Sequence, residues 1–161
     1  MGGIALAVIC AATMTLAQGA QVAFGGLKQD ASLPVEVTAD QLRVDQATGI
    51  AEFSGNVLIG QGAMRLSADN VAVEYAQGDT PGQIARMIAT GNVVLVNGGE
   101  AAEAARAEYT IDSASIILSG NVLLTQGQNA LSGERLIVDL NTGQGTMQGR
   151  VKTIFQPGAA Q

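Results

Sequence analysis

Apolar and polar residues alternate along most of the chain in short runs that Gly, Asn or Asp brings to an end. A period of two places successive side chains on opposite faces of an extended strand, whereas the period of an amphipathic helix is near 3.6. The pattern therefore predicts short β-strands. The runs are Val35-x-Val37, Leu42-x-Val44, Val57-x-Ile59, Met64-x-Leu66, Val71-x-Val73-x-Tyr75, Tyr109-x-Ile111, Ile116-x-Leu118, Val122-x-Leu124 and Leu136-x-Val138-x-Leu140.

A Gly-Asn-Val tripeptide divides the chain into four similar units. It occurs at Gly55-Asn56-Val57, Gly91-Asn92-Val93 and Gly120-Asn121-Val122, and in degenerate form at Gly149-Arg150-Val151. We interpret the asparagines as turn residues that tolerate an unusual φ. Only the second unit is longer, and its extra residues, around 78–82, are turn formers that predict a longer surface loop. Repeated short strands predict an all-β sandwich, barrel or stacked sheet.

One segment has the composition of a helix. Glu100–Ala107 (EAAEAARA) is rich in strong helix formers. The repeat passes through this segment without a change of register. We therefore predict a strand there.

The first residues predict an export signal. Residues 4–16 form a mostly apolar run that is too short to span a bilayer, which takes about 20 residues. Small residues in Thr15-Leu16-Ala17 and Ala17-Gln18-Gly19 suit a signal peptidase. We expect a signal peptide over residues 1–19, a flexible lead-in over 20–32, one folded domain over 33–155 and a disordered tail over 156–161.

The composition excludes several classes of chemistry. The chain has no His, and its single Cys, Cys10, lies in the expected signal, so a His general base, a Cys–His pair and a His/Cys zinc site are excluded. A net charge of −6 disfavours contact with a phosphate backbone, and we expect no nucleic-acid partner. We also expect no catalytic residue, no metal and no cofactor.

The spacing of three motifs is more specific than the alternation. The first two units begin, at Ala39 and Ala68, with Ala-Asp-x-h-x-h-[Asp/Glu], where h is an apolar residue. A second motif, Asp-x-x-Thr-Gly, occurs at 45–49 and again at 139–143. The third, Ser-Gly-Asn-Val, occurs at 54–57. With these motifs, residues 33–155 resemble the OstA-like family of lipopolysaccharide transport proteins, and its periplasmic branch most of all. Ala105 departs from the motif in the third unit.

The resemblance implies a twisted, incompletely closed β-jellyroll of many short antiparallel strands, built here from four repeats. It also implies a periplasmic, non-enzymatic protein that binds lipopolysaccharide and holds the acyl chains of lipid A in an apolar trough. The family bridges inner-membrane LptC-like and outer-membrane LptD-like components by edge-strand addition, and head-to-tail self-association is expected. Unpaired edge strands suit such addition physically.

Alternation suggests which side chains face the lipid, although a shift of one residue would exchange the two faces. The expected interior, lipid-binding positions are Val35, Val37, Val57, Ile59, Leu66, Val73, Tyr75, Val96, Tyr109, Ile111, Leu118 and Val138.

Three other functions stay open. The chain is alternatively a membrane-anchored, LptC-like partner, if residues 4–16 are not cleaved, or a structural β-solenoid as in an adhesin. A polysaccharide-processing β-helix enzyme would need clustered carboxylates, whereas the charges here are spread thinly. Asp45 with Glu52 as an acid–base pair is a weaker reading than solvated carboxylates.

Two sets of charged residues also invite a functional reading. Recurring Asp40, Asp69 and Glu134 would suit Ca²⁺, but turn-end carboxylates are the simpler interpretation. Four scattered arginines would suit lipid phosphates, but surface charges are the simpler interpretation. These arginines are Arg65, Arg86, Arg106 and Arg135.

Overall fold

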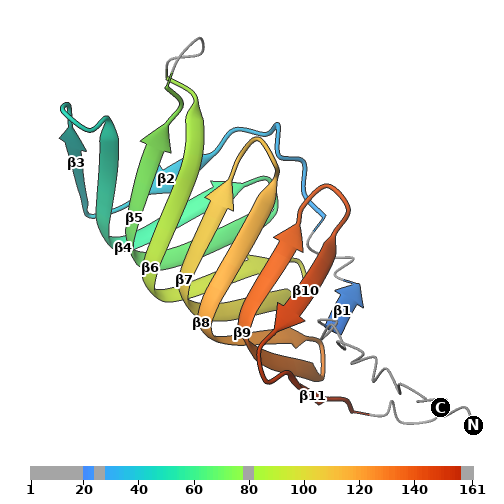
Figure 1. Cartoon of the computed structure of the whole chain (residues 1–161). Helices are drawn as coiled ribbons and strands as arrows, with labels where there is room; N and C mark the ends of the chain where they lie inside the picture. Colours follow the sequence, from blue (N-terminus) through green and yellow to red (C-terminus); the bar gives the residue numbers. More distant parts are fainter. Residues whose placement is uncertain (1–19, 24–27, 78–81, 157–161) are drawn as a thin grey trace, which may run out of the picture.

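The computed structural model describes residues 20–23, 28–77 and 82–156, and most of them form antiparallel β-strands (Figure 1). Along the sheet the order is β1-β10-β9-β8-β7-β6-β5-β4-β2, while β3 also pairs with β4 and β11 with β9. From β4 to β9, each strand pairs with its neighbours in the chain. The strands are β1 (Ala20–Ala23), β2 (Glu36–Thr38), β3 (Gln41–Asp45), β4 (Ile50–Gln61), β5 (Met64–Tyr75), β6 (Ile84–Asn97), β7 (Glu100–Thr110), β8 (Ser115–Gln126), β9 (Asn129–Asp139), β10 (Gln144–Gln148) and β11 (Lys152–Ile154).

The strands β4 to β9 bend near their middles, so that one continuous sheet folds into two facing layers (Figure 1). The pairing register shifts at each bend, for example between Ser54 and Val57 and between Thr90 and Val93. We call the layer that contains β3 and β10 the front sheet and the layer that contains β2 and β11 the rear sheet. The expected all-β, incompletely closed jellyroll of antiparallel strands is confirmed.

The short runs of alternation are halves of these longer strands. Gly-Asn does not end a strand but forms a bulge within it, with φ of +79° at Gly91 and +47° at Asn92. Bulges of this kind increase the local bend and leave pairing intact on either side. The strand expected over 100–107 is confirmed as the first part of β7.

The core lies between the two sheets. Inward side chains from every strand of β4 to β10 are buried there, among them Leu95, Ile116, Leu124, Leu136 and Met147. Burying each such aliphatic side chain stabilises the fold by about 1.5–3 kcal/mol. The two sheets meet at the bends on one side and separate toward their hairpins on the other, which leaves an open side (Figure 1).

Residues 28–35, which we call the strap, cross this open side between β1 and β2 (Figure 1). At one end, the main-chain N–H of Gln29 donates to the carbonyl oxygen of Leu140 at the hairpin between β9 and β10 (3.0 Å). At the other end, β2 pairs with β4 in the rear sheet. The expected lead-in over 20–32 therefore contains β1 and part of a hydrogen-bonded crossing segment.

Several expectations fall on residues outside the described ranges. They are the signal peptide over 1–19, most of the longer loop around 78–82, and the tail after Gln156. Within the described ranges, no helix is long and apolar enough to cross a membrane.

Candidate functional site

The interior between the sheets is largely apolar and is filled by side chains in this structure. A cavity of about 10 Å³ remains within it, bounded by side chains of both sheets, including Ile59, Met64, Met87, Tyr109 and Ile116. That volume is near the least that one water molecule requires. An acyl chain can therefore enter only if side chains move or the sheets separate. Met64 and Met87 suit such movement, because methionine is flexible and fills irregular gaps.

Most of the expected interior positions do face this space. Val57, Ile59, Leu66, Val73, Tyr109, Leu118 and Val138 are buried in the core. Val35, Val37 and Ile111 are half-buried and pack against the core from its margin. Their contact with lipid stays a prediction.

One of the expected interior positions, Val96, is wrong, and a second, Tyr75, is partly exposed at the end of its strand. Val96 is 38% exposed and faces outward, whereas Leu95 beside it is fully buried. The run Val93-Val94-Leu95-Val96 is apolar throughout, so it carries no alternation from which to choose a face. Tyr75 follows the inward phase of Val71 and Val73 but is 36% exposed, because it is the last residue of β5, where the register shifts.

Two buried polar residues were not predicted from the sequence, Asn97 of β6, which is 4% exposed, and Gln61. Of these, Gln61 joins several elements. It is 1% exposed and follows Val57 and Ile59 on the inward face of β4. A polar side chain in phase with an apolar run is the signal that would have found it.

Gln61 connects three parts of the open side. Its Oε1 accepts a hydrogen bond from the Tyr109 hydroxyl of the front sheet (3.0 Å). Its Nε2 donates to the carbonyl oxygens of Ala31 (3.1 Å) and Leu33 (2.9 Å) in the strap. Its own carbonyl oxygen accepts from Gln29 Nε2 (2.7 Å). The front sheet, the rear sheet and the strap are thus joined at one buried side chain.

Burial raises the pKa of the Tyr109 hydroxyl above its ordinary value. Unfolding exposes the phenol and returns its pKa to about 10. Above that pH the unfolded chain loses this proton more readily than the folded chain does. The contribution of Tyr109 to stability is therefore complete below about pH 10 and is lost as the pH rises through the folded pKa.

We expect the free energy of unfolding to fall more steeply above pH 10 in the natural chain than in Tyr109→Phe, which lacks the ionisable group. Urea unfolding curves of both proteins at several pH values measure this difference. Parallel pH profiles would contradict the assignment of this pH dependence to Tyr109. Tyr75 is present in both proteins, so it cannot account for a difference between them.

The recurring carboxylates lie at the bends. Asp40 Oδ2 accepts from Asn56 Nδ2 (2.9 Å), and Asp69 Oδ2 accepts from Asn92 Nδ2 (2.8 Å). Glu134 takes the corresponding place beside Gly149, where its amide donates to the Gly149 carbonyl oxygen (3.2 Å). These contacts give the repeated residues a structural role, and the described residues contain no group of three or more His, Cys, Asp or Glu placed to hold a metal.

The other charged candidates lie apart from the interior. Asp45 Oδ1 accepts from the amides of Ala47 (2.8 Å) and Thr48 (3.3 Å) in a turn. Glu52 is paired with Arg43 in the β3–β4 register. Both carboxylates therefore have positions typical of solvated hairpin residues.

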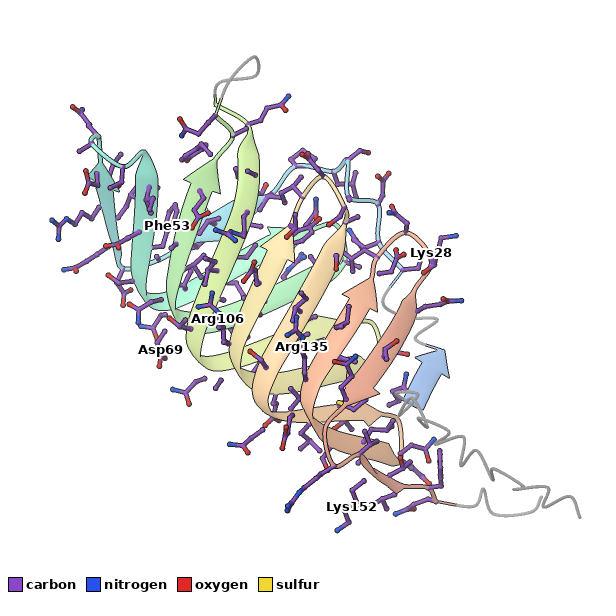
Figure 2. The ribbon with its side chains drawn as sticks, viewed as in Figure 1. Lys28, Phe53, Asp69, Arg106, Arg135 and Lys152 are labelled. Atoms are coloured by element: carbon purple, nitrogen blue, oxygen red, sulfur yellow. The ribbon has the colours of Figure 1, made fainter. Side chains whose placement is uncertain are left out.

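The arginines lie on outer surfaces. Figure 2 shows Arg106 and Arg135 projecting from the front sheet. Arg86 contacts Glu74 (2.6 Å) and Glu108 (3.2 Å), and the bond to Glu74 is the main reason that its pKa is raised. Arg65 donates to the carbonyl oxygens of Gly62 and Met64. We find no grouping of these side chains around the interior.

Apolar side chains are exposed at both ends of the layered strands. At the β3 end, Leu42 and Val44 are 57% and 59% exposed, although they pair with Phe53 and Ala51 and so lie on the inward face. At the other end, Phe155 is exposed beyond β11, and Ile154 is exposed on the outer face of β11, because it pairs with Ala130 next to the inward Leu131. The apolar interior therefore continues to the surface at the β3 end.

Comparison with known proteins identifies a matching family and a solved structure with a similar fold. Residues 36–144 match the family model described as the LptA/(LptD N-terminal domain) LPS transport protein. The fold is similar to that of LptH, the LptA-homologous periplasmic component of the conserved lipopolysaccharide transport device from Pseudomonas aeruginosa. That match has a TM-score of 0.70 and 18% sequence identity, over 80% of this chain and 99% of the LptH chain. No curated protein matches the sequence.

Proposed function

Because the chain belongs to the LptA/LptD N-terminal-domain family of lipopolysaccharide transport proteins, we propose that it binds the acyl chains of lipid A between its two sheets. It does so in the periplasm and bridges LptC-like and LptD-like membrane components. It is a carrier and not an enzyme.

The observation that carries the proposal is the continuous apolar interior, which has one open side and exposed apolar side chains at both ends. Full burial of an acyl chain in such a space contributes about 0.8 kcal/mol per methylene. Separating the sheets to admit the chain costs part of this energy, which keeps binding reversible. Reversibility is what a protein that passes lipid onward requires.

Lipid contact is tested by placing a photo-crosslinking amino acid at Val37 or at Glu36. Val37 packs against the core from β2, and its neighbour Glu36 is exposed. We expect purified lipopolysaccharide to crosslink at Val37 and much less at Glu36. Equal labelling would indicate nonspecific adsorption, and a folded protein that labels at neither position would contradict lipid binding.

The bridging role follows from the ends of the sheets. Among the described residues, β3 pairs only with β4, so its other edge has backbone groups open to another strand. The exposed Leu42 and Val44 would continue the apolar interior into the next molecule. A second copy, or a partner with the same fold, satisfies both features at once.

We expect Leu42→Glu to abolish head-to-tail association without unfolding the protein, because Leu42 is already 57% exposed in the single chain. The control is Gln41→Glu, which adds the same charge on the opposite face of β3. Light scattering across a concentration series measures the association. Assembly of Leu42→Glu equal to that of the control would exclude this end as the interface.

A further inference from the structure

The strap occupies the place where a ligand would enter the interior. It crosses the open side between the hairpins of the two sheets (Figure 1). Ala31 and Val35 pack against the core from this position. A molecule that enters between the sheets from this side must therefore displace the strap.

The hydrogen bonds that hold the strap are directed to carbonyl groups. Gln61 Nε2, on a side chain that is 1% exposed, donates to the carbonyl oxygens of Ala31 and Leu33. Tyr109 holds the same amide in place by donating to its Oε1. If the strap leaves, two amide hydrogens remain at an apolar site without acceptors, which costs free energy.

The surroundings of these hydrogens are apolar. The small cavity within the interior is bounded by Tyr109 together with Ile59, Met64 and Met87. Gln61 itself follows Ile59 on the inward face of β4. The site thus combines a carbonyl-binding donor at the entrance with an apolar space behind it.

We propose that Gln61, positioned by Tyr109, binds the amide or ester carbonyl at the head of an acyl chain, and that the strap fills this subsite until the ligand displaces it. The strap carbonyls take the place of the ligand carbonyl in the closed protein. This inference rests on the proposed function and specifies where the polar end of each bound acyl chain is recognised.

Competition between strap and ligand has a measurable consequence. Only molecules in which the strap is open can bind the ligand. The apparent affinity is therefore the intrinsic affinity multiplied by the fraction of open molecules. Loosening the strap without altering Gln61 must therefore strengthen binding. An ordinary stabilising segment would give the opposite result or none.

Gln29→Ala is the variant that loosens the strap. It removes the donor to the Gln61 main-chain carbonyl and leaves the Gln61 side chain unchanged. Ser32→Ala is the control, because among the described residues the Ser32 hydroxyl donates a hydrogen bond only to Asp30, within the strap itself. The probe is N-decanoyl-N-methylglucamine, a sugar-alcohol amide of an acyl chain, titrated by calorimetry below its micelle concentration.

We expect Gln29→Ala to bind this probe about two- to tenfold more tightly than the natural chain, which corresponds to the loss of one hydrogen bond from the closed state. Amides of residues 29–35 should also exchange hydrogen faster in this variant. Ser32→Ala should match the natural chain in both measurements. Faster exchange without tighter binding would overturn the competition.

Recognition of the carbonyl is tested with Gln61→Leu and a second probe, decyl glucoside, which has a glycosidic oxygen in place of the amide and so has no carbonyl group. The natural chain should prefer the amide probe, and Gln61→Leu should lose that preference. Tyr109→Phe, which removes only the hydroxyl that orients Gln61, should reduce the preference and serves if Gln61→Leu does not fold. An unchanged preference in the folded variants would overturn the subsite.

The strap subsite and the proposed lipid-binding function can be rejected separately. Lipopolysaccharide that crosslinks at Val37 while Gln29→Ala and Gln61→Leu have no effect on the probes would reject the strap subsite and leave the proposed function in place. A folded protein that crosslinks no lipid and binds neither probe would reject both.

Discussion

Leu95→Asp is expected to prevent folding, whereas Val96→Asp, one residue further along β6, is expected to leave the fold intact. Leu95 is fully buried between the sheets, and Val96 is 38% exposed on the outer face. Replacing Leu95 removes core packing at a cost of about 2–5 kcal/mol and places a carboxyl group in apolar surroundings. A domain has only about 5–15 kcal/mol of stability to lose.

Circular dichroism and urea unfolding of the two variants measure this effect. They differ by one position on one strand and carry the same new side chain, so composition and net charge are matched. Equal stability of the two proteins would mean that the faces of β6 are assigned wrongly. The result also decides between Val96, which was expected inside from the sequence, and Leu95, which the structure places inside.

Gly91→Ala is expected to destabilise the protein by about 2–5 kcal/mol, which combines the strain of a left-handed backbone with overpacking. Gly91 has a φ of +79°, and a Cβ there would collide with the Asp69 side chain, which holds Asn92 across the bend. Figure 2 places Asp69 at the edge where the two sheets meet. The bend would therefore lose its hydrogen bond and its close packing together.

Gly98→Ala is the matched control for this prediction. Gly98 also has a positive φ, +59°, but nothing lies within 4 Å of a Cβ built there. We expect it to cost only the backbone strain, about 1–2 kcal/mol. The difference between the two free energies of unfolding measures the contact with Asp69, and equal values would exclude a role for that contact.

The sequence predicts much of this fold because local patterns and tertiary structure agree. Period-two alternation identifies the strands, and the spacing of Gly-Asn-Val identifies where they change direction. The repeat also overrides the helix propensity of 100–107 correctly, because pairing with β6 and β8 outweighs local preference in β7. Inward-facing positions can be predicted from the sequence wherever only one face of a strand is apolar, as at Val57 and Ile59.

Other features depend on contacts that no local pattern encodes. Val93 to Val96 are all apolar, so only pairing with β5 and β7 decides which side chains face inward. Tyr75 has the inward phase but lies at a strand end, and its exposure depends on what packs beside it. The strap has no repeat pattern, and its position depends on hydrogen bonds to Leu140 and Gln61, which are distant in sequence.

Pairing between neighbours in the chain makes the repeat a unit of length. Because β5 to β8 each pair with the strands before and after them in the chain, inserting one more two-stranded unit would lengthen the stack by about 10 Å. The cross-section that an acyl chain meets would not change. The number of units therefore acts as a ruler, by which homologous chains can span different distances while keeping the same internal surface.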